Sequence, residues 1–240
     1  MIINYAHRGA SGTYPENTML SFEKAFELGA SGIETDVQMT SDGVLVLIHD
    51  ERVDRTTDRI GFVKDYTYND IRKLDAGSWL SDEFQNQRIP SFEELLIFMK
   101  GNNLFLNLEL KSNIIQYPYI EKKVIETIYK YDMADRTILS SFNHYSMVKC
   151  KEIDKNIKIG LLYMSGLYRP EHYAKFVGAE ALHPYFYSLN EEIIRGIKSE
   201  GILINTFTVN DEKYMEMFID SGIDGIITNY PEKLYKLLGV

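Results

Sequence analysis

Two histidines with charged neighbours are the residues of this sequence best suited to chemistry. His7 and Arg8 follow a short apolar run, and His49 and Asp50 follow another. A histidine can take or give a proton near neutral pH, whereas an arginine carries a permanent charge that suits an anion. Each histidine by itself would most simply be structural. Two of them at the carboxyl ends of neighbouring strands would favour acid–base catalysis, because catalytic groups of α/β proteins gather there.

Acidic side chains form a second group, on segments that have the pattern of buried strands. Glu34 and Asp36 are two residues apart, so on a strand they point to the same face. In segment 104–111 every leucine falls on one face, which we expect to pack on surrounding helices. The opposite face, which would then point into a barrel, carries Asn107, Glu109 and Lys111.

Carboxylates inside a barrel need compensation, because burying an unpaired charge is costly. A divalent cation would provide it, and carboxylate oxygens suit Mg²⁺ or Ca²⁺ better than zinc or copper. An internal network of ion pairs with Arg8 and Lys111, without any metal, would also provide it. The spacing leaves both interpretations open. The candidate metal ligands are Glu34, Asp36 and Glu109.

The segments that would position these groups alternate between strand-like and helix-like patterns, which predicts parallel β/α units. So many units favour an α/β fold of the TIM (β/α)8 barrel type. There are more strand candidates than the eight places of such a ring, so one is misread or lies outside it. The connection 38–43 is too short for a helical crossover, and we therefore expect an irregular barrel near the second and third strands. The strand candidates are 2–6, 32–38, 44–49, 104–111, 137–142, 158–163, 181–185, 202–209 and 225–228.

A single barrel domain would account for residues 1–240. Segment 51–88 interrupts the alternation with a polar stretch rich in Asp, Arg and Thr, and we interpret it as a small insertion near the top of the barrel. A helix is predicted to follow at 91–100. It would start with Ser91 and Glu94, the arrangement of a capping box.

The composition is that of an ordinary globular chain. Of its 240 residues 45% are hydrophobic and 25% are charged, which is enough apolar material for a core. The net charge of -9 argues against nucleic acid and anionic membranes as main partners, because both attract basic surfaces. A small anionic substrate is still compatible, because a bound metal or a local arginine–lysine pair can reverse the field at a site.

Several further expectations concern the environment of the protein. The sequence has no recognisable secretory leader and no apolar run long enough to span a bilayer, so we expect a cytoplasmic protein without stable membrane insertion. The one cysteine, Cys150, lies in a helix-like stretch, which argues against a disulfide framework and indicates a structural thiol. The sequence leaves a homodimer open.

Short motifs follow one another in order along nearly the whole chain. They are His7-Arg8-Gly9, Pro15-Glu16-Asn17-Thr18, Glu34-Thr35-Asp36, His49-Asp50, Arg55-Thr56-Thr57, Glu109-Leu110-Lys111, Phe207-Thr208-Val209-Asn210 and the segment 222–228. Each is weak alone, but the ordered set resembles the glycerophosphodiester phosphodiesterase family. The resemblance implies a TIM barrel and a divalent-metal enzyme. It would convert glycerophosphodiesters, such as glycerophosphocholine or glycerophosphoethanolamine, to sn-glycerol 3-phosphate and an alcohol.

The resemblance also implies roles for the matching positions. His7 and His49 would be the general acid and base, and Arg8 and Lys111 would contact the phosphate. Phe207 would form an aromatic wall of the substrate site. The implied metal ligands are again Glu34, Asp36 and Glu109.

Two positions depart from the family pattern. Phe207 stands where the family usually has Trp, which gives a weaker cation–π surface for a choline head group. Asn229 stands where the family usually has Asp. We expect Asn229 to serve as the N-cap of the last helix much as Asp would, with little functional consequence.

These residue types suit phosphodiester hydrolysis on chemical grounds too. A metal would act as a Lewis acid, one histidine would take a proton from the nucleophile, and the other would protonate the leaving alkoxide. The sequence does not assign these two roles, nor does it decide between water and the substrate's 2-hydroxyl as nucleophile. Two alternatives stay open. One is a related phosphodiesterase acting on a lysophospholipid or phosphoinositide, and the other is a non-catalytic phosphodiester-binding barrel.

Overall fold

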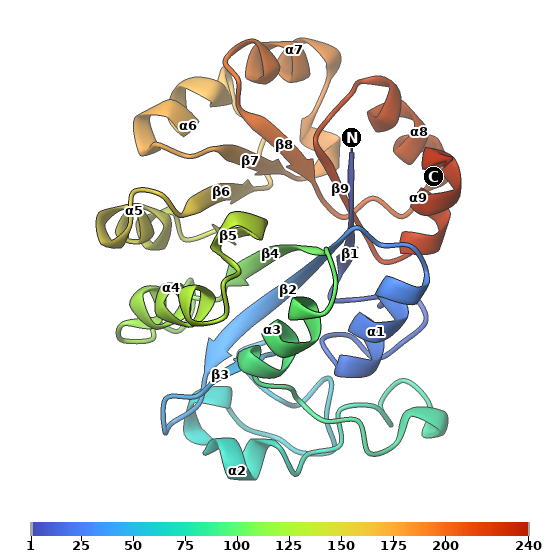
Figure 1. The fold of residues 1–240 in the computed structure, drawn as a ribbon, viewed down its shortest axis with the longest axis vertical. Helices are drawn as coiled ribbons and strands as arrows, with labels where there is room; N and C mark the ends of the chain where they lie inside the picture. The colour runs from blue at the N-terminus through green and yellow to red at the C-terminus, as the bar shows by residue number, and fades with distance from the viewer. Residues whose placement is uncertain (1, 240) are drawn as a thin grey trace.

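The computed structural model describes residues 2–239, and its strands form a closed barrel surrounded by helices (Figure 1). Parallel pairing runs around the ring, and β1 closes it by pairing with both β2 and β9. Within the described range the ring strands are β1 (Ile3–His7), β2 (Gly32–Met39), β4 (Phe105–Leu110), β5 (Thr137–Ser141), β6 (Lys158–Tyr163), β7 (Ala181–Pro184), β8 (Leu203–Thr206) and β9 (Gly225–Thr228). The predicted TIM barrel is therefore confirmed.

One strand lies outside the ring. β3 (Leu45–Leu47) pairs antiparallel with β2, because the chain turns back directly after β2 through residues 40–44. Gly43 in this turn has a φ of 82°, a value that glycine adopts without steric cost. A turn this short cannot reach a parallel neighbour, which needs a crossover of a dozen residues or more. The expected irregularity near the second and third strands is confirmed, and β3 is the surplus strand candidate.

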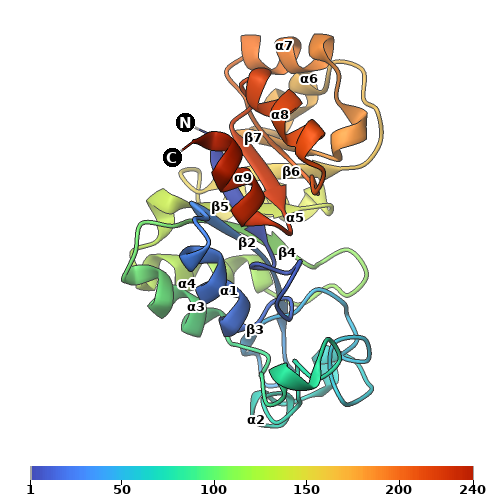
Figure 2. The ribbon, with the colours of Figure 1, turned by 90° about the vertical axis from the view of Figure 1, so that its right-hand side faces the viewer.

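Helices cover the outside of the ring and complete the β/α units (Figures 1 and 2). They pack on outward strand residues in a core where Phe22, Leu108 and Phe218 are fully buried. The helix predicted at 91–100 is present and carries the capping box. The helices are α1 (Met19–Glu27), α3 (Phe92–Lys100), α4 (Ile120–Lys130), α5 (His144–Ile153), α6 (Pro170–Val177), α7 (Glu191–Ser199), α8 (Glu212–Asp220) and α9 (Pro231–Leu238). Among residues 2–239, none has the length and apolar character needed to cross a bilayer.

Residues 51–88 lie at one end of the molecule, around the short helix α2 (Tyr68–Ile71) (Figure 2). They contain 3-10 turns at Val63–Asp65 and Asp82–Phe84. Together with β3 they form a small core separate from that of the barrel. Its members are Val46, Ile48, Val53, Val63, Ile71, Leu74, Ala76 and Ile89. The division of the chain into one barrel domain with this insertion stays a prediction.

Polar side chains fill part of the barrel interior. Asn205 Nδ2 donates to His183 Nε2 at 3.0 Å, and both side chains are buried. Gly160 makes room for them, because a Cβ at that position would come within 2.3 Å of His183 Nε2. Burial lowers the pKa of His183 to about 3, so this histidine is a neutral packing residue.

Candidate active site

Three buried carboxylates meet inside the ring and form what we call the carboxylate cluster (Glu34, Asp36 and Glu109). β2 and β4 are neighbours, and their register places Asp36 beside Glu109. One oxygen from each of the three side chains lies within 4.8 Å of the other two. Strands that are distant in the sequence thus bring the predicted acids together.

Two cations lie against the carboxylate cluster. Lys111 Nζ is 2.9 Å from Glu109 Oε1 and 3.8 Å from Asp36 Oδ1. Arg8 Nε is 3.4 Å from Asp36 Oδ2. The predicted network of ion pairs is therefore present. It does not exclude a metal, because three carboxylates here face two permanent cations.

The pKa values of the three carboxyl groups show that they disfavour one another's ionised form. Burial, followed by the charges of Asp36 and Glu109, raises the pKa of Glu34 well above its usual value. Burial also raises the pKa of Glu109, despite the opposing charge of Lys111. Burial acts on Asp36 too, but Arg8 and Lys111 outweigh it and hold the pKa of Asp36 below its usual range. An all-oxygen cluster that resists its own ionisation can bind a divalent metal ion.

His7 ends β1 beside the carboxylate cluster. Its Nδ1–H donates to Asn229 Oδ1 at 2.6 Å, so Nε2 carries the free lone pair. That nitrogen is 3.9 Å from Glu34 Oε2. Burial, and then the positive charge of Arg8, lower the pKa of His7 to about 4. His7 is therefore a neutral imidazole whose basic nitrogen faces the carboxylates.

Asn229 does not cap the last helix, so that expectation is wrong. The N-cap of α9 is Tyr230, which makes no side-chain capping bond. The backbone N–H of Asn229 donates to Asn210 Oδ1 at 2.9 Å, and this bond fixes a turn that points the Asn229 amide at His7. The departure from the family pattern thus falls on the partner of a candidate catalytic residue. Asn229 directly follows β9, at the carboxyl end of the ring, and this position could have indicated a role in the site.

His49 reaches the same cavity by a route that differs from the expected one. It follows β3, so it does not lie at the carboxyl end of a ring strand. The chain returns over the ring instead, and the Ile48 N–H donates to the carbonyl of Asp36 at 3.1 Å. His49 Nδ1 donates to Asp50 Oδ1 at 2.6 Å, which leaves Nε2 for the cavity. Asp50 is therefore its orienting partner, as its position suggested.

Two buried amides that the sequence reasoning missed hold this arrangement. Gln38 Nε2 lies within 3.1 Å of the carbonyl oxygens of residues 48, 49 and 50, and so fixes the returning chain. Asn17 Nδ2 donates to Asp36 Oδ2 at 3.0 Å, while Asn17 Oδ1 accepts from Thr35. Gln38 continues the inward face of β2 by one more position, a signal that could have identified it. The motif of residues 15–18 contained Asn17, but its spacing gave no role.

The cavity around these groups has a volume of about 240 Å³, with one polar and one apolar side. Its polar side consists of His7, Arg8, Glu34, His49, Asn107 and Glu109, and its apolar side includes Phe142, Leu162, Met164, Phe207 and Ile227. Phe207 meets Phe142 edge to face, with ring centres 5.8 Å apart. Asn107 Oδ1 accepts from Ser140, and among residues 2–239 the buried Asn107 Nδ2 has no partner.

Comparison with known proteins shows which family this chain belongs to. A model of the glycerophosphoryl diester phosphodiesterase family matches residues 7–233. A glycerophosphodiester phosphodiesterase of Caldanaerobacter subterraneus subsp. tengcongensis is 47% identical over 233 residues, which cover 97% of this chain and 96% of the relative. The chain belongs to the glycerophosphoryl diester phosphodiesterase family.

Solved structures extend the likeness to the whole barrel. A putative glycerophosphoryl diester phosphodiesterase from Silicibacter pomeroyi has a TM-score of 0.91 at 25% identity, and the match covers 100% of this chain and 95% of that one. A phosphodiesterase from Oleispira antarctica, in complex with the product sn-glycerol-3-phosphate, has a TM-score of 0.89 at 28% identity, with 98% and 96% covered. This chain is accordingly an enzyme, a glycerophosphodiester phosphodiesterase.

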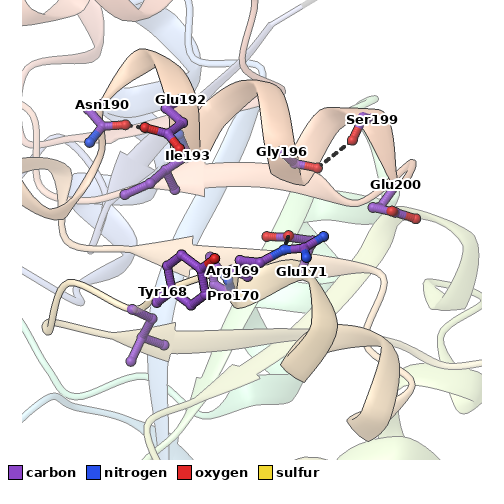
Figure 3. A pocket seen from close by; sticks show the side chains of 11 residues that line it. Tyr168, Arg169, Pro170, Glu171, Asn190, Glu192, Ile193, Gly196, Ser199 and Glu200 are labelled. Atoms are coloured by element: carbon purple, nitrogen blue, oxygen red, sulfur yellow. Dashed lines mark hydrogen bonds and ion pairs between the residues drawn. The ribbon is translucent and has the colours of Figure 1, made fainter.

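Cavity size alone would not locate the site of this phosphodiesterase. A cavity of about 420 Å³ lies between α6 and α7 on the outside of the barrel (Figure 3). None of the site residues predicted from the sequence lines it. Its buried carboxylate, Glu171, already accepts from Arg169 Nε at 3.2 Å. The groups suited to phosphodiester chemistry lie at the smaller cavity in the mouth of the barrel.

Proposed function

We propose that this enzyme hydrolyses small glycerophosphodiesters, such as glycerophosphocholine or glycerophosphoethanolamine, to sn-glycerol 3-phosphate and an alcohol. One observation carries the proposal: two imidazoles, one guanidinium and two acids of the carboxylate cluster line one cavity, and Lys111 contacts the cluster. A cavity of about 240 Å³ suits a small diester. The Oleispira relative supports the product, because sn-glycerol-3-phosphate is bound in its structure.

The residues present fit a resident divalent cation. Glu34, Asp36 and Glu109 would hold Mg²⁺ or Ca²⁺, since their donors are all oxygen and a cation would relieve the raised pKa values of the two glutamates. When bound, the ion supplies Lewis acidity at a phosphoryl oxygen. Arg8 and Lys111 would contact the phosphate of the substrate directly. Arg8 can do so with two parallel N–H groups, whereas Lys111 provides a point charge.

The two histidines divide the proton transfers. We assign His7 as general base, because its partner Asn229 is a neutral amide and its Nε2 lone pair is free. We assign His49 as general acid, because the carboxylate of Asp50 stabilises an imidazolium that can protonate the leaving alkoxide. The nucleophile is either water or the substrate's 2-hydroxyl, and a transient cyclic phosphate would identify the second.

The test is a coupled assay for sn-glycerol 3-phosphate released from glycerophosphocholine. We expect EDTA to abolish release and added Mg²⁺ or Ca²⁺ to restore it. His7→Ala and His49→Ala should each lower kcat by roughly a hundredfold to ten-thousandfold. Glu171→Gln alters a buried carboxyl in the other cavity and should leave the rate unchanged. No release with either ion, over a panel of head groups, would refute the proposal.

The apolar side of the cavity favours a second candidate, a phosphodiesterase acting on a lysophospholipid or phosphoinositide. Phe142, Leu162 and Phe207 line that side, and Met164 is 61% exposed, which is accessible surface for an acyl chain. Turnover of a lysophospholipid compared with that of its deacylated diester separates the two. Binding without turnover, unchanged by His7→Ala, would instead indicate a non-catalytic barrel. A cytoplasmic location and a homodimer stay predictions.

A further inference from the structure

The position of His49 raises the question of what holds it over the carboxylate cluster. Ring strands are fixed by hydrogen bonds on both sides, but His49 follows β3, which lies outside the ring. Gln38 fixes the backbone of this returning segment. The imidazole is held through Asp50, so its orientation depends on what fixes the Asp50 carboxylate.

Arg55 fixes this carboxylate and at the same time bonds a second one, that of Glu16. Arg55 Nε donates to Asp50 Oδ2 at 2.6 Å, and Nη2 lies 3.2 Å from Asp50 Oδ1. The two terminal nitrogens of Arg55 also donate to Glu16 Oε1 and Oε2, each at 2.8 Å. One planar guanidinium thus joins a residue beside His49 to a residue of the loop between β1 and α1.

Glu16 connects this contact to the other half of the catalytic machinery. Arg8 Nη1 donates to Glu16 Oε1 at 2.9 Å, so two guanidinium groups share one carboxylate. Burial alone would raise the pKa of Glu16, but Arg55 and Arg8 outweigh it and keep Glu16 ionised. The contacts run without a gap from the proposed phosphate ligand Arg8, through Glu16, Arg55 and Asp50, to His49.

We infer that Arg55 and Glu16 form a clamp that positions the His49 imidazole over the carboxylate cluster. The inference rests on the proposed function and names Arg55 as a positioning residue for the proton donor. The clamp also contributes to stability, because bidentate pairs in a network are stronger than isolated exposed pairs, although the Arg55 side chain is 43% exposed. Its geometry has a further use, because one planar guanidinium can bond both oxygens of two carboxylates at once, whereas an ammonium has too few N–H donors for four such bonds.

The first test separates binding from turnover in Arg55→Ala. We expect kcat on glycerophosphocholine to fall roughly 10- to 100-fold, the usual effect of removing a residue that orients a functional group. KM should change less than about threefold, because Arg55 touches neither the cavity nor the carboxylate cluster. Arg55→Lys should restore little of this activity, since an ammonium cannot bond both carboxylates in the same bidentate way.

Arg59→Ala is the matched control, because Arg59 lies in the same segment and pairs only loosely with Asp58, at 3.7 Å. The thermal midpoint reports whether each variant folds.

The second test asks whether Arg55 acts through His49. A proton donor matters less when the leaving group is a weak base, so His49→Ala should lose far less activity on a p-nitrophenyl diester than on glycerophosphocholine. Arg55→Ala should show the same dependence on the leaving group. Added guanidinium ion should restore part of its activity but none of that of His49→Ala. In ¹⁵N-labelled protein, the Nδ1–H signal of His49 should weaken in Arg55→Ala and persist in Arg59→Ala.

Glu16→Gln is the third variant, since it weakens the bonds of Glu16 to both Arg55 and Arg8. Because Glu16 also holds Arg8, this variant should raise KM as well as lower kcat, and its effect on kcat should not add to that of Arg55→Ala. An Arg55→Ala enzyme with wild-type kcat, or one equally impaired on both leaving groups, would overturn the clamp. A fully active His49→Ala would overturn the proposed proton donor instead, so the two failures are distinguishable.

Discussion

At the scale of single residues, the two imidazoles differ mainly in what their Nδ1 atoms contact. His7 donates to an amide and His49 to a carboxylate. A carboxylate stabilises a protonated imidazole, whereas an amide fixes the tautomer without adding charge. Two residues of the same type are thereby prepared for opposite proton transfers.

The Asn229 amide gives a prediction at this scale. In Asn229→Ala, His7 loses the acceptor that keeps its proton on Nδ1, so the competing tautomer becomes available and Nε2 is no longer free. We expect kcat to fall about tenfold or more, with stability little changed. Asn229→Asp keeps the acceptor and should retain most activity. Steady-state rates for both variants check this, and a wild-type rate for Asn229→Ala would contradict it.

The types and faces of the site residues could be predicted from the sequence, but their partners could not. The i, i+2 spacing of Glu34 and Asp36 fixes a common face, because the period of a strand is two. Nothing comparable fixes the direction of Asn229. Its side chain points at His7 because a turn after β9 is held by Asn210, a residue nineteen positions earlier in the chain. Such contacts depend on tertiary structure and leave no local pattern.

At the scale of elements, the sequence predicted the ring well because every strand is bounded by a helix or a turn. The length of the 38–43 connection also predicted that one strand would not join the ring in the normal way. Periodicity, however, gives the face of a strand and not its direction. β3 therefore looked like a parallel strand ending in a catalytic histidine, when it is an antiparallel arm that brings His49 back over the ring.

The packing inside the ring gives a prediction about β6. A methyl group at Gly160 would lie 2.3 Å from Nε2 of His183, a side chain that is fully buried. We expect Gly160→Ala to destabilise the protein by about 1–3 kcal/mol or more, as overpacking does. Gly166→Ala is the control, because a Cβ there meets nothing within 4 Å. Urea unfolding measures both, and equal stabilities would show that the interior is looser than described.

At the scale of the whole molecule, the barrel and the segment 51–88 have separate apolar cores. The second core is small, so polar contacts must contribute to its order. Asp75 provides a set of them, accepting from the backbone N–H groups of Gly77, Ser78 and Asn86 at 2.8–3.0 Å. Burial alone would raise the pKa of Asp75, but the N–H groups of Asn86, Ser78 and Gly77 outweigh it and lower this pKa to about 2.

This shift predicts how the segment responds to acid. The folded pKa of Asp75 lies below its usual value of 3.8, so its stabilising effect is complete above about pH 4 and is lost as the pH falls toward 2. Asp75→Asn should remove this part of the acid sensitivity and lower stability at neutral pH by about 1–3 kcal/mol. Hydrogen exchange of residues 51–88 between pH 7 and 2 measures both effects. Asp65→Asn, at a 59% exposed side chain paired with Lys64, serves as control, and identical profiles would contradict the prediction.

Because β3 turns back from the ring, the residues that would bind the substrate and the residue that would protonate its leaving group lie on different parts of the chain. Every candidate ligand for the phosphate and the cation belongs to the ring strands or their immediate ends. The proposed proton donor, His49, instead follows β3 and is held by Arg55 of the segment 51–88. A shortened variant in which a brief linker replaces residues 51–88 would keep the candidate phosphate and cation ligands. It would lose the hydrogen bonds by which Arg55 holds Asp50 beside His49. Such a variant should bind a diester as the full-length enzyme does but cleave it much more slowly, so that it would hold the diester long enough to serve as a sensor of its concentration.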